Sequence, residues 1–121
     1  MYREAKRSAV EWVESHRERL IEVSDVIWGY AELGFVEFKS SKLLADELEA
    51  HGFDVERGVA EIPTAFVATW GKGKPVIGVM GEYDALPGIS QKAVPHKEAI
   101  VEGAPGHGCG HNIHGTSGMG G

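Results

Sequence analysis

The chain has 121 residues, 42% of them hydrophobic and 25% charged, which is typical of one small soluble domain or a piece of a larger one. Its formal net charge of −6 argues against a nucleic-acid partner, which needs a basic face, and no apolar run approaches the roughly 20 residues of a membrane span. A single cysteine cannot form an internal disulfide and no signal peptide precedes the first helix, so we expect a cytoplasmic protein.

Two helices are predicted in the N-terminal half. Arg3–Trp28 contains neither glycine nor proline, and its apolar residues recur at helical spacing with charged residues opposite. The pattern allows a break near Ser15–His16. A second helix is expected over Lys42–Ala50, with Ser40 or Ser41 as its N-cap.

Beyond the second helix the hydrophobic period becomes that of strands. Phe53–Val59 alternates apolar and polar residues, and Ala65–Trp70 is a second candidate strand. Pro75–Met80 is short and almost wholly apolar, which predicts an interior strand covered on both faces. Ile89–Pro105 has no clear period and is expected to be a loop, while glycines weaken the prediction of a helix from Asn112. Helices followed by a mostly β segment predict one layered α/β unit.

Two acidic residues follow the predicted interior strand, in GEYDALPG (Gly81–Gly88). Active sites in open α/β sheets collect at the carboxyl ends of strands, so Glu82 and Asp84 could bind a metal or orient a metal-bound histidine. An isolated acidic pair of this kind is more often a solvated surface turn. On residue types alone, the surface turn is the favoured interpretation.

The strongest chemical signal is Gly106–Gly121, reading GHGCGHNIHGTSGMGG. Cys109 and His111 are separated by one residue, and their thiolate and imidazole groups suit a borderline-soft divalent metal. One cysteine excludes a closed structural zinc site of paired cysteines, so an open catalytic metal site fits better. The alternatives are an inert loop and a nucleophilic Cys109 with His107, His111 or His114 as its base.

The two motifs in this order closely resemble the M20 family of metal-dependent amidohydrolases and peptidases. The similarity is greatest to the branch with aminobenzoyl-glutamate hydrolases and aminoacylase-like enzymes. The lead-in AELGFVEFKSSKLLADELEAHGFDVERGV is also similar, so the resemblance runs from about Trp28 to Gly121. It implies that residues 1–121 are the N-terminal part of a zinc-peptidase-like α/β catalytic domain, without the C-terminal half and the dimerising lid domain.

The resemblance also implies an activity and a set of site residues. The activity is hydrolysis of an amide bond in an N-acyl amino acid or dipeptide, with two divalent ions, zinc or manganese. By this resemblance Cys109 and His111 match metal ligands, and Asp84 matches the acid that orients the catalytic centre. Glu82 and His114 are expected beside the ligands, and the general base is a glutamate that this chain does not contain.

Cys109, His111 and Asp84 are too few to hold two ions. We therefore expect a truncated fragment that is inactive alone, holds metal weakly or not at all, and associates with itself where apolar strands lack neighbours. The alternative is a stand-alone metal-binding or assembly module without catalysis.

Overall fold

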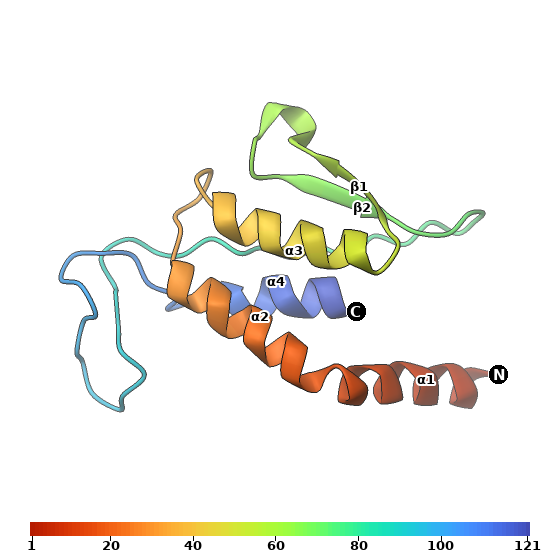
Figure 1. Cartoon of the computed structure of the whole chain (residues 1–121), viewed down its shortest axis with the longest axis horizontal. Coiled ribbons are helices and arrows are strands. Elements are labelled where there is room, and N and C mark those ends of the chain that lie inside the picture. Colours follow the sequence, from red (N-terminus) through yellow and green to blue (C-terminus); the bar gives the residue numbers. More distant parts are fainter.

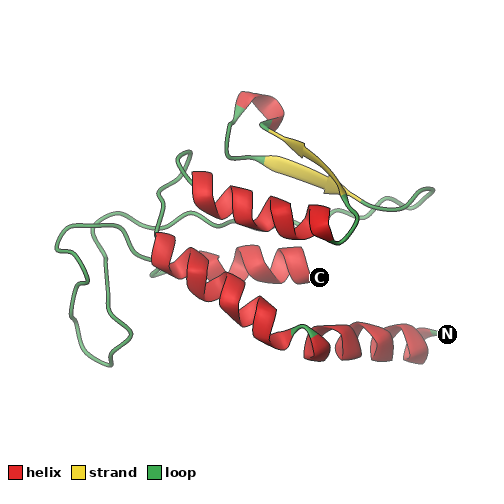
Figure 2. Cartoon of the chain, viewed as in Figure 1, coloured by secondary structure: helices red, strands yellow, loops and turns green.

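A computed structural model describes the whole chain, from Met1 to Gly121. It contains four α-helices and a two-stranded antiparallel sheet, so the predicted α/β class is confirmed (Figure 1). In chain order the elements are α1 (Tyr2–Ser15), α2 (Arg17–Tyr30), α3 (Phe38–Ala50), β1 (Asp54–Arg57), the 3-10 helix η1 (Val59–Glu61), β2 (Phe66–Thr69) and α4 (His111–Gly120). Figure 2 shows the long loops that separate β2 from α4. No helix combines the length and the apolar character needed to cross a membrane.

The predicted N-terminal helix is divided into α1 and α2 at His16, where the sequence allows a break. His16 has a φ of −106° and a ψ of 9°. Its ring stacks on the indole of Trp12, with the centroids 4.0 Å apart. No residue of α1 is buried, whereas Val23 and Ile27 of α2 are fully buried. Only the α2 part of the predicted apolar stripe therefore enters a core.

The core lies where α2, α3 and α4 meet. Val23, Ile27 and Leu44 form its centre, and Met119 of α4 packs against them. In Figure 1, α4 runs beside α2 and α3, and the β1–β2 hairpin covers the opposite side of α3. The core is small, because only 13 of the 121 residues are buried. Much apolar surface is consequently left exposed.

The β1–β2 hairpin confirms the two strands predicted over 53–59 and 65–70. The strands are antiparallel, with Asp54 opposite Thr69 and Arg57 opposite Phe66. Exposed and partly buried residues alternate along β2, as expected of a sheet with one face on a helix. The hairpin packs this face on α3.

α3 begins at Phe38, earlier than predicted, and the prediction that Ser40 or Ser41 caps it is wrong. Both serines are buried inside the helix. The carboxylate of Glu32 accepts hydrogen bonds from the backbone N–H groups of Lys39 and Ser40, at 3.0 and 2.8 Å. An acid in the preceding loop thus satisfies first-turn donors that an N-cap side chain would otherwise take.

The prediction of an interior strand over Pro75–Met80 is also wrong. The segment has no regular structure, and its four large apolar side chains are 65 to 85% exposed. No backbone–backbone hydrogen bond involves residues 71–84. Strand structure depends on hydrogen bonds to a neighbouring strand, and none lies beside this segment, which runs as extended chain past α3 and α4 (Figure 1).

The expected loop over Ile89–Pro105 is confirmed, since it forms turns but neither helix nor strand. α4 begins at His111 and contains three glycines. A Cβ on Gly115 would lie 3.0 Å from the Cβ of Tyr83, and Gly118 is similarly close to the same incoming segment. These glycines are therefore used for close packing, at the expense of helix propensity.

Candidate metal centre

Two isolated β-bridges hold the acidic motif, one to the chain that follows α2 and one to the chain that precedes α4. One is parallel between Leu33 and Ala85, and the other is antiparallel between Leu86 and Gly106. Residue 106 must be glycine for this approach, because a Cβ there would lie 2.3 Å from the carbonyl oxygen of Ile89. The motifs 81–88 and 106–121, separated by a loop in the sequence, consequently meet in space.

Asp84 and His111 form a hydrogen-bonded pair at this meeting point. Asp84 Oδ1 lies 2.8 Å from His111 Nδ1. An ionised carboxylate can only accept, so Nδ1 carries a proton, and in the neutral ring the lone pair is then on Nε2. A carboxylate that fixes the tautomer and orientation of an imidazole in this way is the usual partner of a metal-binding histidine.

Glu82 and His114 face the same point. Glu82 Oε2 lies 3.3 Å from His111 Nε2 and 3.8 Å from His114 Nδ1. One ligand atom from each of these three residues lies within 4.8 Å of the others, and carboxylate oxygen and imidazole nitrogen are zinc ligands. His114 Nδ1 also accepts a hydrogen bond from the Glu82 backbone N–H, at 3.2 Å, and an ion at that nitrogen would replace this bond.

Cys109 is outside the cluster formed by Glu82, His111 and His114. Its thiol is free and exposed. Two of the histidines considered as its base have other partners, since His111 bonds Asp84 and His114 bonds Glu82. The geometry therefore gives no support to a thiol–imidazole nucleophile.

His107 is a site neighbour whose importance the sequence does not reveal. Both of its ring nitrogens are buried and lack a hydrogen-bond partner. Burial lowers the pKa of His107, the backbone of Ile27 and the charge of Asp84 oppose this effect, and the nearby His111 adds to it. The carboxylate and imidazole donors of Glu82, His111 and His114 fit the divalent metal that the family resemblance implies.

A buried network anchors the residue between the two site acids. The Tyr83 hydroxyl donates to the carbonyl oxygen of Thr64, and Thr64 Oγ1 donates to Glu37 Oε2 at 2.8 Å. Burial, with the charge of Glu37, raises the pKa of Tyr83 to about 12. These residues are far apart in the sequence, so no local pattern could have identified the network.

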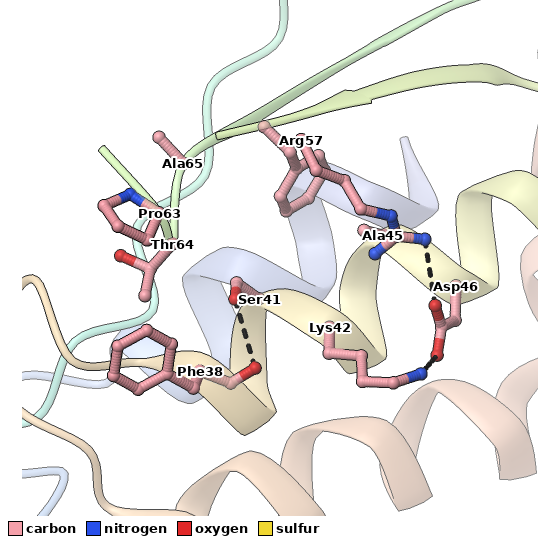
Figure 3. A pocket seen from close by; sticks show the side chains of 10 residues that line it. Phe38, Ser41, Lys42, Ala45, Asp46, Arg57, Pro63, Thr64 and Ala65 are labelled. Carbon is pink, nitrogen blue, oxygen red and sulfur yellow. Dashed lines mark hydrogen bonds and ion pairs between the residues drawn. The ribbon is translucent and has the colours of Figure 1, made fainter. Parts of the chain in front are cut away.

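A separate pocket of about 360 Å³ lies between α3 and the hairpin (Figure 3). Asp46 on its wall pairs with both Lys42 and Arg57. The hydrogen bond from Lys42 lowers the pKa of Asp46. The opposite charges of this pocket pair with each other, and its lining residues do not form a cluster of metal-ligand atoms like that of Glu82, His111 and His114.

Comparison with known proteins places the chain in a family. No protein-family model matches it. It is 48% identical over 106 residues to a component of the p-aminobenzoyl-glutamate hydrolase of Escherichia coli (strain K12), a match that covers 87% of this chain and 22% of that protein. It is 34% identical over 97 residues to thermostable carboxypeptidase 1 of Saccharolobus solfataricus, covering 78% and 24%. It is 30% identical over 126 aligned positions to Xaa-Arg dipeptidase of Homo sapiens, covering 89% and 24%. The chain belongs to the M20 amidohydrolase family.

The M20 resemblance drawn from the two motifs is thus confirmed. The chain spans 22 to 24% of the length of these M20 relatives. The match to each of them nevertheless covers more than three quarters of this chain. The chain that contains Asp84 and His111 is therefore similar to these three hydrolases over most of its own length.

Proposed function

We propose that this chain carries part of the metal centre of an M20 hydrolase that cleaves an amide bond in an N-acyl amino acid or dipeptide. The hydrogen bond of 2.8 Å between Asp84 and His111 is the observation that carries the proposal. In the neutral ring it leaves the lone pair on His111 Nε2, which lies 3.3 Å from Glu82 Oε2. The name of the Escherichia coli relative suggests the substrate class, an aromatic acyl group joined by an amide to an amino acid with free carboxylates.

Two divalent ions, zinc or manganese, are proposed for the complete protein. His111 and Cys109 are the proposed ligands from this chain, with Glu82 and His114 beside them. When bound, a divalent ion supplies Lewis-acid polarisation of the amide carbonyl and lowers the pKa of water. Asp84 holds the proton at His111 Nδ1 and fixes the ring, and the Glu82 carboxylate adds negative charge that attracts cations.

Residues 1–121 are proposed to be a partial catalytic domain that is inactive alone. Hydrolysis needs a general base within hydrogen-bond reach of the attacking water, and no residue of this chain is assigned that role. The proposal therefore includes a C-terminal half and a lid domain as further parts of the working enzyme. A reducing compartment such as the cytoplasm suits the exposed thiol of Cys109.

Hydrolysis of p-aminobenzoyl-glutamate by the longer M20 protein that contains this sequence tests the proposal. Release of glutamate should require a divalent metal and should be lost in His111→Ala. His96→Ala is the matched control, because His96 is an exposed loop histidine, and it should keep the activity. Metal-dependent turnover by the 121 residues alone, or full activity of His111→Ala, would contradict the proposal.

A module that binds one ion without catalysis is the second candidate. The cluster of Glu82, His111 and His114 favours it, because three ligand atoms already lie within 4.8 Å of one another. Zinc titration of the 121 residues separates the two candidates. A module binds one equivalent tightly, keeps it in Cys109→Ser and loses it in His114→Ala, whereas the hydrolase proposal expects weak binding.

A further inference from the structure

The segment that carries the two site acids has few hydrogen bonds to the rest of the chain. Residues 71–84 form no backbone–backbone hydrogen bond, and three hydrogen bonds that involve side chains connect them to other residues. Two of these end on the site histidines, His111 and His114. The third is donated by the Tyr83 hydroxyl to the carbonyl oxygen of Thr64. Tyr83 therefore makes the only hydrogen bond that ties the segment to the chain outside the site.

The side chain of Tyr83 points away from the site that its two neighbours form. Glu82 Oε2 lies 3.3 Å from His111 Nε2, and Asp84 Oδ1 lies 2.8 Å from Nδ1 of the same ring. Successive side chains of an extended chain point to opposite sides. The Tyr83 ring accordingly packs against the core and stacks on Phe66, with the ring centroids 6.2 Å apart. The two acids thus hold both edges of one imidazole, while the residue between them is held by the core.

The acceptor of the Tyr83 hydroxyl is itself fixed in place. Thr64 is only 3% exposed, and its Oγ1 donates to Glu37 Oε2 at 2.8 Å. Glu37 directly precedes α3, where its carbonyl oxygen accepts a hydrogen bond from the Ser41 N–H at 2.9 Å. A buried polar network whose members are bonded to one another rigidifies the structure around it. The hydroxyl of Tyr83 is consequently joined, through two side chains, to the start of a core helix.

We propose that Tyr83 is a positioning residue of the candidate metal centre. Its bond to Thr64 fixes the backbone from which both acids reach His111. Without this bond, Glu82 and Asp84 move relative to the imidazole, and its orientation is lost. The inference rests on the proposed function, because a positioning role at a metal centre requires that His111 binds an ion.

Proton NMR of the metal-free chain tests the positioning role directly. The His111 Nδ1 proton, held by Asp84, should give a separate resonance in the wild-type chain, because the hydrogen bond slows its exchange with water. Tyr83→Phe removes the hydroxyl and keeps the ring in the core, and this resonance should be lost. Tyr2→Phe is the matched control, because Tyr2 is 84% exposed, and it should keep the resonance.

Two further variants separate positioning from a general loss of stability. Thr64→Val leaves Tyr83 intact but removes the donor to Glu37, so it should also weaken the His111 resonance. Ile27→Val removes one carbon from the same core without altering the network, and it should keep the resonance. An unchanged resonance in both Tyr83→Phe and Thr64→Val, or an equal loss in Ile27→Val, would overturn the proposal.

Zinc titration distinguishes failure of this inference from failure of the proposed function. Tyr83→Phe should raise the zinc dissociation constant of the chain about tenfold, the lower end of the cost of losing a residue that orients a metal ligand. Tyr2→Phe should leave it unchanged. Equal zinc affinity of the wild-type chain and Tyr83→Phe would overturn the positioning role alone. No zinc binding at His111 in the wild-type chain would refute the proposed function, and the positioning role with it.

Discussion

Replacing Gly115 by alanine tests how closely α4 packs on the segment that carries the site acids. A Cβ on Gly115 would lie 3.0 Å from the Cβ of Tyr83, 3.1 Å from the carbonyl oxygen of Glu82 and 3.2 Å from Leu44 Cδ1. Two of these neighbours are the backbone and the first side-chain carbon of the site segment, which cannot rotate away. α4 and the segment must therefore move apart.

The expected magnitude follows from two opposing effects. Alanine in a helix is favoured over glycine by about 1 kcal/mol, whereas overpacking of a closely packed position costs about 1–3 kcal/mol. Gly115→Ala should therefore lower the free energy of unfolding by up to about 2 kcal/mol. In contrast, Gly29 in α2 has no atom within 4 Å of its built Cβ, so Gly29→Ala should raise it by about 0.5–1 kcal/mol.

Urea unfolding followed by circular dichroism measures both variants against the wild-type chain. A difference between them of about 0.5–3 kcal/mol should appear, in the direction that makes Gly115→Ala the less stable. If Gly115→Ala were as stabilising as Gly29→Ala, α4 would not contact the Glu82–Tyr83 backbone, and the placement of Glu82 beside the histidines would lose its support.

Three further predictions concern single side chains. In calorimetry, Asp84→Asn should weaken zinc binding about 10- to 100-fold, because it removes the charge that orients His111. Asp54→Asn, in exposed β1, should leave zinc binding unchanged. Because the pKa of Tyr83 is raised to about 12, one of the three tyrosines should ionise near pH 12 in ultraviolet titration. The free energy of unfolding should fall as pH rises from about 10 to 12, because in this range only the unfolded chain loses the Tyr83 proton. The absence of a tyrosine that ionises near pH 12 would refute this. Glu32→Gln should lower the free energy of unfolding by about 1–3 kcal/mol, as expected for hydrogen bonds to a charged group, and a loss no larger than that of exposed Glu102→Gln would contradict the capping role.

Features set by short-range pattern could be predicted from the sequence. The apolar spacing that ends in Val23 and Ile27 is a local property of one helix, and both residues are buried in the core. The break near Ser15–His16 is local as well. The alternation in 53–59 and 65–70 identifies both strands of the hairpin, because these strands pair with each other within a short stretch of chain.

Features that depend on distant partners could not be predicted. The composition of Pro75–Met80 is that of an interior strand, yet a strand needs neighbours that the sequence pattern cannot supply. The cap on α3 comes from Glu32, which lies outside the spacing of any N-cap motif. At the site, the meeting of Asp84 with His111 was predicted from the two motifs, but the exposed position of Cys109 was not, because local spacing does not fix the direction of a side chain on a glycine-rich loop.

The most direct test of the metal centre is a nitrogen NMR titration of the histidine side chains of this chain with zinc. The chemical shift of His111 Nε2 should change saturably with zinc. Its Nδ1 should keep the proton that it donates to Asp84. The exposed His96 should remain unchanged under the same conditions. A shift at His96 equal to that at His111, or no shift at His111 at any zinc concentration, would contradict the assignment of His111 as a metal ligand.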